Sequence, residues 1–239
     1  MTGIVSYGGY VPRYRLDRKK IFKAMGWMDP STAGNSRGEK AVANFDEDSI
    51  TMAVAAGLSS LKGMDRSKVE GVYFASTTMP YKERLNAGII REALGLGESI
   101  RGADFSGGLK AGTSALLSAL EGAQAGTLKQ TAVCAADCRL GRPASGEEMI
   151  FGDAAAAFLV GNEDVIAEFK GSYSATYDFG DHYRGEFAKY DRKWEDRWIR
   201  DLGYDNFIPA VVKGLLEKYG LKMGDFAKVV YDCHYSAAR

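Results

Sequence analysis

Two kinds of segment alternate along the chain, and their hydrophobic patterns predict strands and helices in turn. Continuous or β-branched apolar runs predict strands at residues 3–10, 69–75, 102–105, 131–136, 154–160 and 228–232. Apolar residues at helical spacing, several with a capping residue, predict helices at residues 18–25, 48–61, 86–94, 111–125 and 206–219. This alternation is typical of an α/β protein. Runs that are apolar throughout, such as 131–136, predict strands covered on both faces.

Four other segments refine this prediction. Helix 111–125 carries small residues on nearly every side, which predicts that it is buried all round. Residues 168–177 alternate between polar and apolar, which predicts a longer, partly exposed strand. Residues 29–40 show no periodicity and are expected to form a loop. The last predicted strand lies close to the end of the chain, so we expect this chain to be one piece of a larger enzyme.

Composition and charge narrow the class of protein. The 239 residues are enough for one good-sized domain or two small ones. The 31 Lys and Arg residues balance 31 Asp and Glu residues, which argues against a general nucleic-acid binder. No apolar run is long enough to cross a membrane, and the strand-like start does not resemble a secretion signal. Three cysteines without framework spacing fit a reducing compartment, so we expect a cytoplasmic protein.

The cysteines and histidines supply one candidate for chemistry. Cys134 and Cys138 lie roughly 13 Å apart if both are on one strand, too far for a shared metal or a disulfide. Cys233 precedes a histidine directly, so on a strand the two side chains face opposite ways. His182 stands in a polar loop and is expected to be solvated. His234 follows an apolar strand, and α/β enzymes place catalytic groups at the carboxyl ends of strands.

Two glycine-containing turns precede apolar elements. The first lies before helix 111–125 and matches no nucleotide-binding motif, yet a helix N-terminus suits a thioester oxyanion or a thiolate. The second opens strand 154–160, where ordinary turn chemistry is an equal explanation. The residues concerned are Gly107, Gly108, Leu109 and Gly112 in the first turn, and Gly152 and Asp153 in the second.

Residues 184–200 interleave aromatic and charged side chains. Basic residues beside aromatics suit the stacking of nucleobases. Acidic residues are as frequent here as basic ones, which favours a solvated helix face or a partner surface instead.

Taken together, several of these segments resemble the thiolase-like superfamily of condensing enzymes. The resemblance is closest to hydroxymethylglutaryl-CoA synthases of archaeal and bacterial type, with ketoacyl-ACP synthase III more distant. It covers the chain from residue 1 to about residue 239, roughly the first two thirds of a family member. It is carried by residues 3–13, 38–42, 46–49, 103–105, 110–113, 152–157 and the strand that ends at His234.

The resemblance implies a thiolase-like layered α/β fold with a central buried helix and an incomplete C-terminal half. Residues 1–165 are then the N-terminal half, and residues 166–239 part of the C-terminal half. It also implies acyl-CoA chemistry, in which a cysteine at the start of the buried helix takes an acyl group. A histidine, here His234, polarises the thioester carbonyl or acts as base, and in the synthases a glutamate exchanges protons.

Two positions depart from the family pattern. Leu109 stands where the family has its nucleophilic cysteine, and a leucine side chain forms no acyl-enzyme. Thr78 stands where the synthases have their glutamate, and the nearest carboxylate, Glu83, is out of register. Cys138 is a poor replacement for the nucleophilic cysteine, because it follows a strand instead of standing at the start of the buried helix. The Gly107 to Gly112 turn is expected at the acyl pocket, with Gly152 and Asp153 shaping its floor.

Three hypotheses stay open. The chain is an acyl-CoA enzyme that uses aldol or retro-aldol chemistry without a cysteine. Alternatively, it is one subunit of a split synthase. That synthase is a homo- or hetero-oligomer, whose further subunit is a thiolase-like chain or an OB-fold zinc protein. A third hypothesis is a non-catalytic scaffold that keeps the dimer surface or a CoA pocket. We expect a CoA thioester as substrate, with no tightly bound cofactor, no metal, and neither a nucleic acid nor a membrane as partner.

Overall fold

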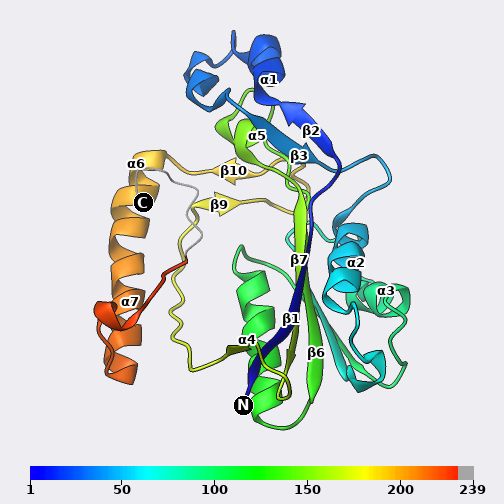
Figure 1. The fold of residues 1–239 in the computed structure, drawn as a ribbon. Coiled ribbons are helices and arrows are strands. Elements are labelled where there is room, and N and C mark those ends of the chain that lie inside the picture. Colours follow the sequence, from blue (N-terminus) through cyan, green and yellow to red (C-terminus); the bar gives the residue numbers. More distant parts are fainter. Residues whose placement is uncertain (231–239) are drawn as a thin grey trace. The chain divides into compact units, whose positions relative to one another are not determined.

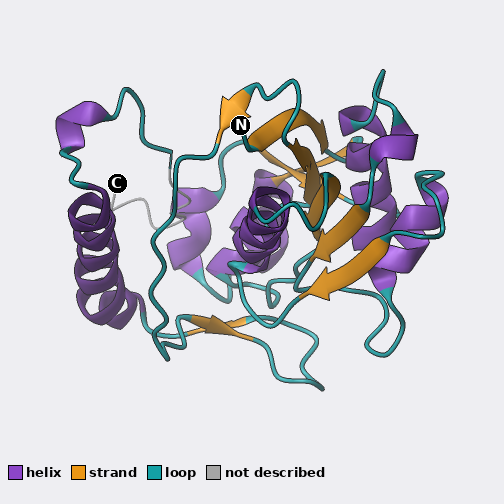
Figure 2. Ribbon diagram, turned by 90° about the horizontal axis from the view of Figure 1, so that it is seen from below, coloured by secondary structure: helices purple, strands orange, loops and turns teal. Residues whose placement is uncertain are grey.

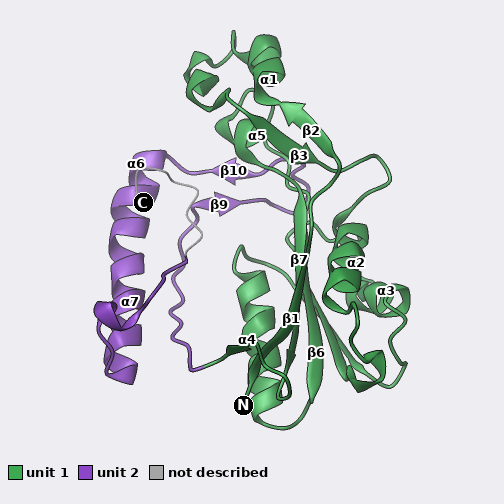
Figure 3. Cartoon of the chain, viewed as in Figure 1, with its two compact units in different colours: residues 1–169 green, residues 170–239 purple. Residues whose placement is uncertain are grey.

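A computed structural model of the chain describes residues 1–230. Their contacts divide the chain into two compact units, Met1–Phe169 and Lys170–Arg239, which are coloured separately in Figure 3. Cys233 and His234 lie outside the described residues. Among the described residues, no helix has the length and apolar character needed to span a membrane.

A six-stranded mixed sheet forms the centre of the first unit (Figure 1). The neighbours β5, β4 and β6 are parallel, while β7 runs antiparallel to β6 and to β1, and β8 pairs antiparallel with β1. In sheet order the strands are β5 (Arg101–Phe105), β4 (Gly71–Ala75), β6 (Gln130–Asp137), β7 (Ala154–Gly161), β1 (Gly3–Tyr10) and β8 (Ala167–Glu168). This mixed α/β architecture confirms the predicted fold class.

Helices cover both faces of the sheet, as Figure 2 shows from below. On one face lie α2 (Ser49–Ser60) and α3 (Asn86–Ala93), and on the other lies α4 (Ala111–Gln124). Because side chains alternate along a strand, Val72 and Phe74 face the first layer, while Tyr73 and Ala75 face α4. All five residues of β4 are buried, as expected for a strand covered on both faces.

Helix α4 is buried along one face only, so the prediction of burial all round is wrong. The residues that pack on the sheet are Ala111, Ala115, Ala119, Leu120 and Ala123. Thr113, Glu121 and Gln124 on the other side are exposed. The small residues allow a close approach to the strands, while the polar positions keep the second face in water.

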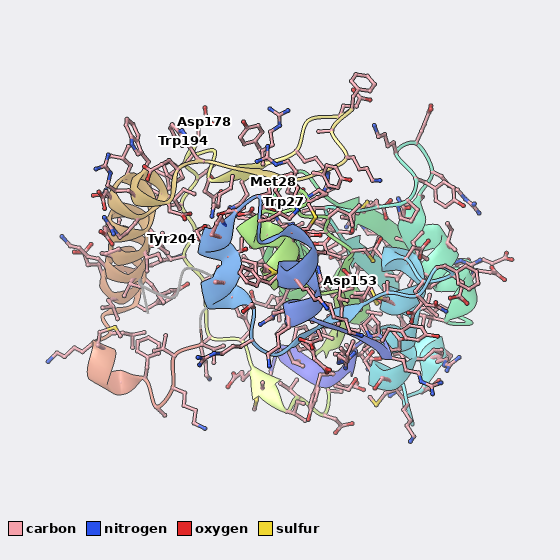
Figure 4. All side chains as sticks on the ribbon, turned by 90° about the horizontal axis from the view of Figure 1, so that it is seen from above. Trp27, Met28, Asp153, Asp178, Trp194 and Tyr204 are labelled. Carbon is pink, nitrogen blue, oxygen red and sulfur yellow. The ribbon has the colours of Figure 1, made fainter. Side chains whose placement is uncertain are left out.

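Short elements make up the rest of the first unit. The segment predicted as a loop at 29–40 contains a 3₁₀ helix, Pro30–Asn35, and the start of β3 (Glu39–Val42), which pairs antiparallel with β2 (Tyr14–Asp17). Helix α1 (Arg18–Met25) begins as predicted after Asp17, whose carboxylate accepts the Lys19 N–H. Trp27 and Met28 follow α1 and are exposed (Figure 4). Helix α5 (Gly146–Ile150) precedes β7.

The second unit is built around helix α7 (Asp205–Tyr219), which ends at Gly220 in the left-handed conformation. It also contains β9 (His182–Tyr183), β10 (Arg192–Lys193), α6 (Asp196–Trp198) and the π-helical turn Ile199–Tyr204. The strand predicted at 168–177 is wrong beyond Glu168, because residues 169–177 form no strand. Residues 228–230 are likewise not a strand, and the end of that predicted element lies outside the described residues.

Aromatic side chains fix the irregular segment of the second unit against α7. Tyr177 stacks on Phe207 with ring centroids 4.0 Å apart. The ring of Tyr173 lies so close to Gly214 that an added Cβ there would meet it at 2.3 Å. Contacts of Tyr173 and Tyr177 with α7 therefore hold this segment, in place of the strand hydrogen bonds that its alternating pattern predicts.

Candidate functional site

Three parallel strands and the start of a fourth deliver their loops to one edge of the sheet. Ala75 of β4 is in register with Phe105 of β5 and Ala135 of β6, so the chain leaves all three strands at the same edge. The antiparallel β7 begins there, since Asp137 pairs with Ala154. This edge therefore gathers residues 76–78, 106–110, 137–138 and 152–153, as is usual for sites in open α/β sheets.

Asp137 connects two of these loops through one oxygen. Its Oδ1 accepts hydrogen bonds from Ser76 Oγ at 2.9 Å, Thr77 N at 2.7 Å, Thr77 Oγ1 at 3.0 Å and Thr78 Oγ1 at 2.9 Å. Thr78 Oγ1 in turn accepts the Cys138 N–H at 3.0 Å. The loop after β4 is thus fixed to the end of β6, with a carboxylate beside residue 78.

The Gly107 to Gly112 turn leads into the N-terminus of α4. Gly107 has a φ of +83°, a conformation that favours glycine, and the Ala111 N–H donates to the Gly108 carbonyl. No side chain caps α4, so after Ala111 the N–H groups of Gly112 and Thr113 stay available to a ligand. Leu109 is 49% exposed at this turn and offers no nucleophilic atom.

Gly152 and Asp153 connect the start of β7 to β3. The Asp153 Oδ2 accepts the Ala43 N–H at 2.7 Å, and the Asp153 N–H donates to the Ala41 carbonyl at 3.2 Å. Burial raises the pKa of the Asp153 carboxyl group, opposed by the Ala43 hydrogen bond. A Cβ on Gly152 would contact only the Ala41 backbone, at 3.7 Å. The turn is thus fixed to residues 41 and 43 by one side-chain and one backbone hydrogen bond, at the end of the sheet where the loops gather.

The two described cysteines hold protonated thiols. Cys134 is fully buried on β6, and burial raises its pKa to about 12. Cys138 is partly buried just beyond the strand, where burial and then the charge of Asp153 raise its pKa to about 12. A nucleophilic thiol requires the opposite surroundings. Neither residue is therefore suited to take the acyl group.

The histidine predictions have different outcomes. His234 lies outside the described residues, so its role stays a prediction. The expectation that His182 is solvated is wrong, because its side chain is 3% exposed and its Nδ1 lies 3.3 Å from Asp181 Oδ2. In the short β9–β10 pair, Lys193 lies opposite His182. Within residues 1–230, no group of three His, Cys, Asp or Glu residues is arranged to hold a metal.

Asp137 is the residue of this edge that sequence reasoning missed. The sequence did contain a signal for Asp137, because this residue follows the apolar run 131–136 at the carboxyl end of a strand. The same rule about strand ends singled out His234. Its partners at residues 76–78 lie about 60 positions earlier, so the hydrogen bonds cannot be inferred from local sequence.

Sequence comparison finds curated relatives across nearly the whole chain. The chain is 35% identical to the hydroxymethylglutaryl-CoA synthase of Pyrococcus furiosus, covering 96% of this chain and 65% of that protein. It is 34% identical to the synthase of Methanocaldococcus jannaschii, covering 97% and 68%. The chain thus spans about two thirds of the length of these relatives. No family model matches the chain.

Solved structures of low sequence identity share the fold. An HMG-CoA synthase complexed with CoA matches with a TM-score of 0.80 at 19% identity, covering 95% of this chain and 58% of that one. The 3-oxoacyl-(acyl carrier protein) synthase III of Pseudomonas aeruginosa matches with a TM-score of 0.77 at 20% identity, covering 94% and 73%. Fold and sequence agree, and the chain belongs to the hydroxymethylglutaryl-CoA synthase family.

Proposed function

We propose that this chain binds acyl-CoA thioesters and makes or breaks carbon–carbon bonds on them without an acyl-enzyme. The observation that carries the proposal is Leu109, which is exposed at the turn before α4 and has no atom that can attack a thioester. Aldol chemistry needs no such nucleophile. A base removes an α-proton, the enolate carbon attacks a ketone, and a proton returns to the new alkoxide; the retro-aldol reaction reverses these steps.

The substrate class rests on the relatives. The matched curated proteins are hydroxymethylglutaryl-CoA synthases, and matched structures hold CoA or 3-hydroxy-3-methylglutaryl-CoA. In this proposal His234 polarises the thioester carbonyl or acts as base. The turn of Gly107, Gly108, Leu109 and Gly112 holds the acyl group, and Gly152 with Asp153 shapes the floor of the pocket.

Leu109 also favours a second candidate, a CoA-binding scaffold subunit of a thiolase or synthase complex. In that case the chain is not itself catalytic, and its partner is a thiolase-like chain or an OB-fold zinc protein. Either function is consistent with a cytoplasmic homo- or hetero-oligomer.

Calorimetric titration with CoA and acetyl-CoA, followed by product analysis after incubation with 3-hydroxy-3-methylglutaryl-CoA, tests the proposal. Micromolar binding together with release of a shorter acyl-CoA is the expected result. Binding without turnover would favour the scaffold subunit, and turnover only after a thiolase-like chain is added would favour one subunit of a split synthase. Failure to bind either CoA or acetyl-CoA would contradict both functions.

A further inference from the structure

The hydrogen bonds around Asp137 are distributed unequally between its two oxygens. All four bonds from residues 76–78 reach Oδ1. Within residues 1–230, Oδ2 has no hydrogen-bond donor, and the side chain is only partly buried. Such a carboxylate has one oxygen that fixes its orientation and a second whose lone pairs are open to a ligand.

The other carboxylates nearby serve local structure. Glu47 accepts the Tyr10 hydroxyl group and the Asn44 N–H with its two oxygens. Asp48 caps α2 by accepting the Thr51 N–H. Asp153 holds β3, as described above. Asp137 differs from them because it lies at the carboxyl end of a parallel strand and organises the loop that follows the neighbouring strand.

We propose that Asp137 is the proton-transfer group of the acyl-CoA site, with Oδ1 anchored by residues 76–78 and Oδ2 facing the substrate. This inference rests on the proposed function. In the step, the α-C–H bond of the bound thioester breaks and an O–H bond forms on Oδ2. The electron pair of the broken bond becomes the enolate, and the same proton, or one exchanged with solvent, returns to carbon in the reverse step.

Deuterium incorporation into the α-carbon of acetyl-CoA in D₂O measures this step without requiring condensation. The unaltered chain is compared with Asp137→Asn, which keeps the size of the side chain and removes its charge. Asp65→Asn is the matched control, because Asp65 also accepts bonds from a serine hydroxyl group and a backbone N–H, at residue 67. Asp65 lies before β4, at the other edge of the sheet. CoA affinity is measured by calorimetry for each variant.

We expect Asp137→Asn to lose at least about 100-fold in exchange rate at unchanged CoA affinity, while Asp65→Asn stays within about twofold of the unaltered chain. Should Asp137→Asn unfold, Asp137→Glu replaces it, and a loss of at least about tenfold is expected from the displaced carboxylate. Exchange that persists in a folded, CoA-binding Asp137 variant would overturn the inference.

The two proposals fail in different ways. Binding of CoA without any exchange by the unaltered chain would refute the role of Asp137 and leave the binding function standing. Absence of CoA binding by the unaltered chain would refute both.

Discussion

At the scale of single residues, the proposed chemistry rests on Leu109 and Asp137. The departure at Leu109 was readable from sequence, because a motif position can be checked for a nucleophile without a structure. The environment of Asp137 was not readable, since its four hydrogen bonds join segments distant in the chain. Burial of His182 was also missed, because its short strand carries no local hydrophobic pattern.

The reactivity of the Cys134 and Cys138 thiols tests the surroundings that raise their pKa values. With pKa values of about 12, Cys134 and Cys138 are ionised to only about one part in ten thousand near pH 8. We expect neither to be alkylated by iodoacetamide in the folded protein, and both to react after denaturation. Mass spectrometry of the tryptic peptide that contains both residues measures this. Native labelling as fast as that of free cysteine would contradict the described surroundings.

The Asp153 carboxyl group makes the stability of the fold depend on pH in a direction that can be predicted. Burial raises its pKa in the folded state above the ordinary value of 3.8. Its ionisation therefore lowers stability as pH rises from 3.8 through the folded-state pKa. Asp153→Asn keeps an acceptor for the Ala43 N–H but cannot ionise. It should raise the free energy of unfolding near neutral pH and have little effect near pH 3.8, as urea titrations would measure.

The control for that experiment is Asp65→Asn. Hydrogen bonds from Ser67 lower the pKa of the Asp65 carboxyl group, so its ionised form favours the fold above its ordinary pKa. The variant should therefore lower stability at neutral pH, the opposite direction. A destabilised Asp153→Asn protein at neutral pH would show that the charge of Asp153 is needed by the fold.

At the scale of elements, prediction succeeded where the signal is local. Helices α1 and α2 lie where they were predicted, and Asp17 and Asp48 cap them, because a cap depends on residues within one turn. It failed for residues 168–177, whose alternating pattern serves insertion of aromatic rings against α7 instead of strand pairing. The β2–β3 pair was also missed, since four-residue strands give little periodicity.

The packing of β1 on α2 depends on Gly8. A Cβ at this position would meet the Ala56 carbonyl oxygen at 2.4 Å and the Ser60 nitrogen at 2.5 Å, both backbone atoms. Gly8→Ala should therefore lower the free energy of unfolding by about 1–3 kcal/mol, through forced separation of strand and helix. Urea denaturation followed by circular dichroism measures the change.

Gly97→Ala is the matched control for Gly8→Ala, because a Cβ at residue 97 has no atom within 4 Å. It should stay within about 0.5 kcal/mol of the unaltered chain. Equal effects of the two substitutions would contradict the close approach of β1 and α2.

At the scale of the whole molecule, the alternation of strands and helices was enough to predict the α/β class, and β4 and most of β6 are buried on both faces as their apolar runs predicted. The two units differ in how much apolar surface they bury. The first has a core on each side of its sheet, whereas α7 in the second has no fully buried residue. Unequal burial implies unequal local stability.

Limited proteolysis tests this difference between the units. Trypsin is expected to cut first between residues 170 and 230 and to leave a resistant fragment ending near Phe169. Mass spectrometry of the fragments over time identifies the order of cleavage. Early cuts within β4, β6 or α4, before any in the second unit, would contradict the described burial.

The central claim is acyl-CoA chemistry without an acyl-enzyme, and intact-protein mass spectrometry after incubation with acetyl-CoA tests it most directly. The unaltered chain should retain CoA in native spectra and show no covalent acetyl group after denaturation. Leu109→Cys is the positive control and should gain one acetyl group, because the substitution places a thiol at the N-terminus of α4. A stable acetyl adduct on the unaltered chain would contradict the account and direct attention to its own cysteines.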